Sequence, residues 1–281
     1  MENVISYYYN LVVDKSKFIN NVLIIESDNN LFIAKSIHNI ESFEEIINSM
    51  NSYYYFPILN KEGKYYFEYN NLMYALFKAD GPSELIGENL LFLPIISNIK
   101  IDYSTIWENN IDYFIKKITE MDKDAIEEVN YLNYYIGMSE NAITINENAK
   151  RIPSTARYTI SHFRINYPNY SLYYRDPTEL LIDYISRDIA EYTKSKFFFA
   201  EMTVDELIGL INKYNLNDKE VMFMFARLMY PSYYFDAISE KNIDKRKIIN
   251  KKRESYEKFL YNAMKQIKTS NIYLNIEWLS H

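Results

Sequence analysis

The chain of 281 residues has no cysteine, only three histidines and only five glycines. The lack of cysteine excludes disulfides, a cysteine nucleophile and thiolate metal sites. Three histidines, His38, His162 and His281, are too few to predict a multi-histidine zinc site. Because glycine is scarce, tight loops that cradle phosphate groups are also expected to be scarce.

Long apolar runs and an excess of basic charge are lacking as well. No segment approaches the roughly 20 apolar residues that a transmembrane helix needs. Met1–Asn10 lacks the basic and apolar regions of a signal peptide. The formal net charge is −7, whereas dedicated nucleic-acid binders are usually basic. We therefore expect a cytoplasmic protein that has no transmembrane segment and does not bind nucleic acid.

The first 80 residues have the pattern of a small β-rich lobe. Asp28-Asn29-Asn30 is a turn signal between two short apolar runs. Ser42 followed by Glu45 predicts the start of a helix whose apolar face runs from Phe43 to Met50. The expected strands are Val4–Val13, Asn21–Ser27, Leu31–Ser36, Tyr53–Leu59, Lys64–Tyr69 and Asn71–Lys78.

Beyond Pro82 the pattern becomes helical. Apolar residues recur at helical spacing over residues 107–118 and 122–136. Capping boxes are predicted at Thr203 with Glu206 and at Asn217 with Glu220. The predicted fold is therefore α+β, with a small β-rich N-lobe of antiparallel strands and one helix over residues 1–80, and a larger helical C-lobe over residues 81–281.

The basic segment Lys245–Lys268 is predicted to be one long helix. Its apolar positions give it a side that can face the core. We expect it to pack on the larger lobe with its basic face in solvent, and the alternative is contact with anionic lipid, nucleic acid or an acidic protein.

Two strand ends carry charged residues that suit a nucleotide site. Lys35 ends a predicted strand, and a lysine in that place pairs with nucleotide phosphates and with a glutamate of the next helix, here Glu44 or Glu45. Asp183 ends another apolar strand, and Mg²⁺ prefers carboxylate and phosphate oxygens. The alternatives are a solvated edge lysine at Lys35 and a turn-capping role for Asp183.

The order of these motifs resembles the aminoglycoside phosphotransferase and choline kinase branch of the kinase-like folds. The resemblance implies a two-lobed protein-kinase-like fold and a catalytic loop that reads His-Gly-Asp. His162 matches the histidine of that loop, while Phe163 and Arg164 replace the glycine and the catalytic aspartate. Asn169 and Asp183 lie where the family places its metal ligands.

The segment from Asp183 to Tyr192 is more closely similar to the spore coat-associated YutH proteins, relatives of the CotS group. The strong match covers Ile160 to Thr193. The resemblance implies protein partners in a spore coat and a location in the mother cell or the coat. ATP and Mg²⁺ are the implied cofactors if nucleotide binding is retained. No oligomeric state is indicated.

The departures from the family pattern favour a degenerate kinase. Arg164 stays protonated and cannot act as a general base, and the segment from Tyr7 to Val22 contains no glycine. We therefore predict a pseudokinase without an assigned catalytic residue. Lys35 and Glu45 remain its nucleotide-binding candidates, and Asp183 and Asn169 its metal candidates. The alternative is an active small-molecule phosphotransferase in which Asp176 or Asp188 replaces the lost base.

Overall fold

The computed structural model describes residues 1–19, 22–37, 40–49, 55–79, 93–95, 102–119, 126–165 and 176–267. By packing, the chain divides into two units. The first unit comprises Met1–Ile95, Ile160–Arg164 and Asn169–Ile182, and the second comprises Ile96–Thr159, Ile165–Pro168 and Asp183–His281. The lobe boundary predicted near residue 80 lies outside the described residues and stays a prediction.

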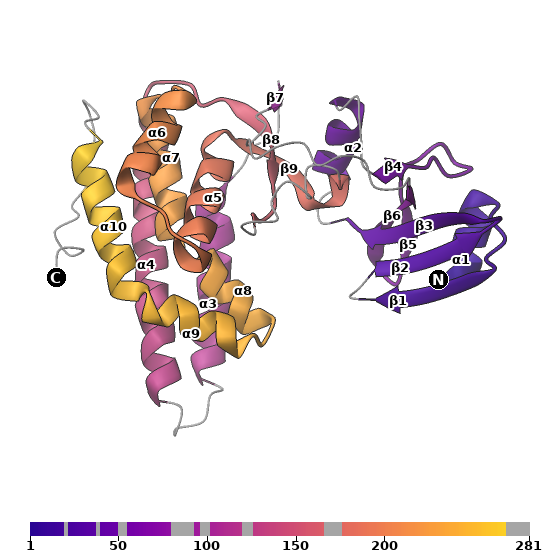
Figure 1. The fold of residues 1–281 in the computed structure, drawn as a ribbon, viewed down its shortest axis with the longest axis horizontal. Coiled ribbons are helices and arrows are strands. Elements are labelled where there is room, and N and C mark those ends of the chain that lie inside the picture. The colour runs from indigo at the N-terminus through magenta and orange to yellow at the C-terminus, as the bar shows by residue number, and fades with distance from the viewer. Residues whose placement is uncertain are drawn as a thin grey trace. The chain divides into compact units, whose positions relative to one another are not determined.

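The first unit is built on an antiparallel sheet (Figure 1). Its strand order is β1-β2-β3-β6-β4, and β5 pairs with β6. The strands are β1 (Lys15–Ile19), β2 (Val22–Ser27), β3 (Asn30–Ser36), β4 (Tyr55–Pro57), β5 (Phe67–Tyr69) and β6 (Leu72–Ala79). Five of the six predicted strands are thus confirmed, and β4 and β5 are shorter than predicted.

The turn between β2 and β3 forms at the predicted residues. Asp28 and Asn29 have φ values of 48° and 60°, and Ser27 pairs directly with Asn30. Two residues with positive φ match the right-handed twist of the strands that they join. Asn and Asp adopt this conformation more readily than other non-glycine residues, because their short side chains bond to the local backbone.

The predicted strand Val4–Val13 is wrong, because these residues begin with helix α1 (Glu2–Tyr9). Ile5 is fully buried, and Val4, Tyr8 and Tyr9 pack against the same apolar cluster. Adjacent residues such as Val4 and Ile5 point to opposite faces of a strand, whereas on a helix both can lie on one face together with the residues four positions later. The β-branched and aromatic residues favour a strand by propensity, and packing of the helical face on the sheet overrides it.

Helix α2 (Ile40–Ser49) presents the predicted apolar face. Phe43, Ile46 and Ile47 are buried, and Phe43 packs edge-on against Phe77 of β6 at 6.4 Å between ring centroids. The helix begins at Ile40, so Ser42 lies inside it and is not the N-cap that the sequence predicts.

Three further strands, β7 (Leu93–Ile95), β8 (Tyr158–His162) and β9 (Leu180–Tyr184), form a small sheet in the order β7-β8-β9. A short 3₁₀ helix, η2 (Pro177–Glu179), immediately precedes β9. Along the sequence, the division between the two units falls within β8 and within β9.

The second unit is helical, with α7 at its centre (Figure 1). Helix α7 packs on α4 and α5, and every residue from Glu220 to Met229 is buried. A helix that is buried all round is expected in the core of a bundle. The helices are α3 (Tyr103–Thr119), α4 (Ile126–Lys150), α5 (Ser186–Phe199), α6 (Val204–Lys213), α7 (Asp218–Met229), α8 (Ser232–Ser239), α9 (Ile243–Lys251) and α10 (Arg253–Gln266).

Both predicted capping boxes form, at the starts of α6 and α7. The single long helix predicted through the basic segment is wrong, because α9 and α10 are separated at Lys252. The Lys252 ammonium donates to the carbonyl oxygens of Phe197 at 2.8 Å and Ala200 at 3.2 Å, at the end of α5. The predicted core-facing side is confirmed, since Phe259 and Leu260 are buried.

Candidate functional site

Lys35 of β3 makes ion pairs within the first unit. Its Nζ donates to the carboxylate of Asp176 and to Oε1 of Glu179, the latter at 3.2 Å. Burial acts to lower the pKa of Lys35, but the two carboxylates outweigh it and the net pKa is raised. The ammonium therefore stays charged, and its described partners lie on η2 and just before it.

The local structure of η2 positions the carboxylate of Asp176, one of the partners of Lys35. Asp176 caps η2, and its Oδ1 accepts from the backbone N of Thr178 at 3.0 Å and from its hydroxyl at 2.6 Å. Pro177 suits the first position of such a turn because its own N–H is absent. Helix α2, which carries the other nucleotide candidate Glu45, lies against η2. The nucleotide-binding roles of Lys35 and Glu45 stay a prediction.

The segment that matches the catalytic loop begins where β8 ends. His162 is fully buried, and Phe163 donates its backbone N–H to the carbonyl of Glu179 at 2.8 Å. The guanidinium of Arg164 lies 4.8 Å from the ring centroid of Phe163, and its Nη1 donates to the Phe163 carbonyl at 3.0 Å. The metal candidate Asn169 lies outside the described residues.

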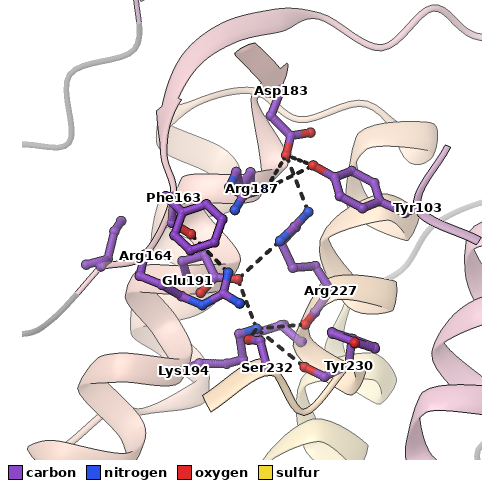
Figure 2. A network of polar contacts seen from close by, with 12 residues as sticks. Tyr103, Phe163, Arg164, Asp183, Arg187, Glu191, Lys194, Arg227, Tyr230 and Ser232 are labelled. Carbon is purple, nitrogen blue, oxygen red and sulfur yellow. Dashed lines mark hydrogen bonds and ion pairs between the residues drawn. The ribbon is translucent and has the colours of Figure 1, made fainter. Parts of the chain in front are cut away.

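Asp183 of β9 lies in the second unit at the head of a buried polar network (Figure 2). The residue is 1% exposed. Its Oδ2 accepts from the Tyr103 hydroxyl, from Arg187 Nη1 at 2.6 Å and from Arg227 Nη2 at 3.3 Å. Its Oδ1 accepts from the backbone N of Tyr184 at 2.6 Å.

The network continues from Asp183 through α7 to α5 and the start of α8 (Figure 2). Arg227 Nη1 lies 3.3 Å from Glu191 Oε1, and Lys194 Nζ lies 3.0 Å from the same oxygen. The Lys194 ammonium also donates to the Arg227 carbonyl at 3.1 Å and to the Ser232 hydroxyl at 2.7 Å. Buried charges need such compensation, because removing ions from water is costly.

Tyr103, at the start of α3, completes this network and was missed by the sequence reasoning. Its ring stacks on Trp107 at 5.3 Å, and the guanidinium of Arg227 lies 4.3 Å from its ring centroid. Burial raises the pKa of Tyr103, so its hydroxyl stays protonated and can donate to Asp183. Its position four residues before Trp107, on the same face of α3, is the one sequence signal that could have drawn attention to it.

A family model described as "Spore coat putative kinase YutH" matches residues 97–275. The chain belongs to the YutH family. The Endospore coat-associated protein YutH of Bacillus subtilis (strain 168) is 26% identical over 214 residues. That match covers 64% of this chain and 62% of the relative, so it spans less than two thirds of the relative's length.

A solved phosphotransferase structure shares the fold of this YutH family member. A spectinomycin phosphotransferase in complex with ADP and spectinomycin aligns over 99% of this chain and 96% of its own, with a TM-score of 0.53 and 14% identity. An aminoglycoside phosphotransferase from Alicyclobacillus acidocaldarius aligns over 95% and 96%, with a TM-score of 0.48 and 10% identity. The likeness to the spectinomycin phosphotransferase confirms the predicted two-lobed, kinase-like α+β fold.

Both oxygens of Asp183 are engaged by donors of the protein, and its role as a ligand of the Mg²⁺ that kinase-like folds use stays a prediction. An ionised carboxylate offers about four lone-pair sites, and Asp183 accepts four hydrogen bonds, two of them from guanidinium groups. Within the described ranges, no group of three or more His, Cys, Asp or Glu side chains could hold a metal ion.

Protein kinases cover the nucleotide phosphates with a loop that reads G-x-G-x-x-G. In this YutH family member, Ile19 of β1 pairs with Val22 of β2, and no glycine occurs from Tyr7 to Val22. The sequence of the first hairpin therefore lacks the glycines of that loop.

The sequence predicts no transmembrane helix. No helix in the described parts of the chain combines the length and the apolar character needed to cross a bilayer.

Proposed function

We propose that this chain is a pseudokinase, a kinase-like scaffold that carries out no phosphoryl transfer and serves as a structural or interaction protein of the spore coat. The observation that carries the proposal is the pairing of Asp183 with Arg187 and Arg227. Phosphoryl transfer depends on positioned metal ions and charges. A carboxylate that already accepts hydrogen bonds from two guanidinium groups lacks the free oxygen lone pairs that binding a metal ion requires.

The other two expected parts of a phosphotransferase support the same proposal. Lys35 is engaged by Asp176 and Glu179, and these carboxylates compete with nucleotide phosphates for its charge. Arg164 stands at the position of the catalytic aspartate. A guanidinium cannot accept the proton of an attacking hydroxyl, because it stays protonated.

Membership of the YutH family supports a role in the spore coat. The curated relative is described as endospore coat-associated. Other coat proteins are therefore the proposed partners, and the mother-cell cytoplasm or the coat is the proposed location. Protein inventories of the spore coat and of the mother cell of the source organism test the location, since absence from both contradicts it.

The second candidate function is an ATP- and Mg²⁺-dependent small-molecule phosphotransferase. It is favoured by the likeness to spectinomycin phosphotransferase and by the place of Lys35 on the third strand, where protein kinases carry their nucleotide lysine. Asp176 or Asp188 would then have to act as the base. That role requires Asp176 to release both Lys35 and Thr178.

Thermal unfolding with nucleotide separates the two functions. We expect no shift of the unfolding temperature with millimolar Mg-ATP or Mg-ADP beyond that of MgCl₂ alone. A ligand at 100 times its dissociation constant stabilises a protein by about 2.7 kcal/mol, so binding would be easily seen. A saturable shift that is abolished in Asp183→Asn and retained in Asp112→Asn would show that nucleotide binds. It would contradict a pseudokinase that binds no nucleotide. Turnover of ATP with any acceptor would overturn the proposal.

A further inference from the structure

A cavity of about 240 Å³ lies in the second unit among α3, α4, α8 and α9. Its lining includes three basic side chains, Lys117, Lys241 and Arg246, and one carboxylate, Glu128. Tyr234 and two aliphatic side chains complete the wall. We call this cavity the basic pocket.

The charge of the basic pocket is unbalanced. Three cations face one anion, which gives the lining a formal charge of 3 − 1 = +2, while the whole chain carries −7. Arg246 Nη1 lies 3.1 Å from Glu128 Oε1. In the part of the chain that the structure describes, neither Lys117 nor Lys241 forms an ion pair. The pocket therefore concentrates positive charge that this part of the protein does not neutralise.

Arg246 also has an unused donor. Its Nε is buried and has no hydrogen-bond partner among the described residues. Buried N–H groups are paired in the great majority of cases, because leaving one unpaired is unfavourable. An oxyanion that enters the basic pocket would bring acceptors to this guanidinium, and arginine presents its donors in a fork that matches carboxylate and phosphate.

Lys241 reaches the pocket from an unusual backbone position. It has a φ of 55° and follows α8, where its backbone N–H donates to the Ile238 carbonyl at 3.1 Å. Glycine or asparagine is the common residue in such a helix end. A lysine there has less favourable backbone geometry, and it adds a charge to the pocket.

The basic pocket is separate from the network at Asp183. Lys117 lies on α3 fourteen residues after Tyr103, whose hydroxyl contacts Asp183. At 1.5 Å per residue, that separation is about 21 Å along the helix. Neither Lys35 nor Asp183 lines the pocket, so an inference about it stands apart from the proposed pseudokinase function.

We propose that the basic pocket binds a small oxyanion carrying two or more negative charges, either a phosphate monoester or a di- or tricarboxylate. Arg246 would hold the oxyanion by charge-assisted hydrogen bonds, and Lys117 and Lys241 would neutralise its charge. The volume is below the roughly 300–1,000 Å³ of pockets that enclose drug-sized ligands. The ligand is therefore a compact anion and not a nucleotide.

Isothermal titration of the full chain with inorganic phosphate and with citrate, at constant ionic strength, tests the proposal. We expect saturable binding of at least one of them. Binding of phosphate alone identifies the phosphate source, and binding of citrate alone identifies the carboxylate source. The double variant Lys117→Gln, Lys241→Asn should lower the affinity by about tenfold or more, or 1.4 kcal/mol for each factor of ten. Asparagine is chosen because it tolerates the positive φ of Lys241.

The matched control is Lys116→Gln with Lys247→Gln, which removes two exposed charges from α3 and α9 outside the pocket. It should leave the affinity unchanged. A second variant, Glu128→Gln, removes the single carboxylate of the pocket and should raise the affinity. The proposal is overturned if neither anion binds, if both double variants weaken binding equally, or if Glu128→Gln lowers the affinity.

Discussion

Arg187 Nη1 lies 2.6 Å from Asp183 Oδ2, between side chains that are 4% and 1% exposed. Arg227 approaches the same oxygen at 3.3 Å. The strand-end aspartate, which the resemblance to phosphotransferases marks as a metal ligand, thus joins β9 to α5 and α7. Its contacts are those of a structural anion in a buried network.

Asp183→Asn should therefore reduce stability strongly. The substitution removes the charge that compensates two buried guanidinium groups, and breaking such buried pairs costs about 3–5 kcal/mol. Urea unfolding of the variant measures the loss. Asp112→Asn, an exposed aspartate on α3, is the control and should stay within about 0.5 kcal/mol of wild type. Unchanged stability of Asp183→Asn would show that the network is dispensable.

Tyr103→Phe separates the hydroxyl from the ring. The variant keeps the stack on Trp107 and the ring below Arg227 but loses the hydroxyl that donates to Asp183 and accepts from Arg187 at 2.9 Å. Leaving buried partners unsatisfied costs about 1–3 kcal/mol. Tyr103→Leu should lose more, because the aromatic contacts disappear as well.

The measurement is again urea unfolding, with Tyr113→Phe as the control. Tyr113 lies on the same helix and is 56% exposed, so loss of its hydroxyl should have little effect. If Tyr103→Phe were as stable as wild type, the hydroxyl would not support the network.

Local chemistry made much of the fold predictable. The Asp28-Asn29 turn and the capping boxes of α6 and α7 depend on residues within four positions of one another. The strand predicted at Val4–Val13 is wrong because the prediction followed the β propensity of these residues. Their helical conformation is stabilised by packing on the sheet, which the local sequence does not reveal. The break at Lys252 depends likewise on carbonyl groups of a distant helix, α5.

The candidate site was less predictable, because its contacts are distant in sequence. Motif spacing identified Lys35 and Asp183 as notable residues. It could not identify their partners, since Asp176 lies 141 residues from Lys35 and Arg227 lies 44 residues from Asp183. A charged residue at a strand end has the same local pattern whether it holds a ligand or a structural ion pair.

A double-mutant cycle tests the pair of Lys35 and Asp176. Lys35→Met leaves the carboxylate of Asp176, 7% exposed, without its cation and should cost about 1–3 kcal/mol. Asp176→Asn should also destabilise the protein. The loss in the double variant should fall short of the sum by about 0.5–3 kcal/mol, because the two residues are in contact. Lys64→Met is the control, because Lys64 pairs with Glu62 and both side chains are about half exposed.

The pH dependence of the same variants gives an independent check. The pKa of Lys35 is raised in the folded protein, from an ordinary value of 10.5. Its contribution is thus fully present below pH 10.5 and is lost as the pH rises through the folded pKa. The stability difference between wild type and Lys35→Met should stay constant from neutral pH to about pH 10. Additive single variants, or a difference that disappears near neutral pH, would contradict the ion pair.

Glu206 predicts a pH effect in the acid range. The ammonium of Lys196 donates to its Oε1 at 2.7 Å, and the backbone N of Thr203 donates to Oε2 at 2.9 Å. These bonds lower the pKa of Glu206 from its ordinary value of 4.5, with the Lys196 bond as the larger cause. A carboxyl group with a lowered folded pKa stabilises the protein above its unfolded pKa, and loses that contribution as the pH falls through the folded pKa.

Glu206→Gln should isolate this effect, because glutamine can still accept the capping bond from Thr203 while it carries no charge. The variant should unfold at a lower temperature than wild type at pH 7. The gap should stay constant down to about pH 5 and close as the pH falls below 4.5, because the unfolded chain and then the folded protein take up the proton. Thermal unfolding followed by circular dichroism between pH 7 and pH 3 measures it. Glu201→Gln, at an exposed residue just before α6, should show no such gap, and a Glu206 gap independent of pH would exclude the charge as its cause.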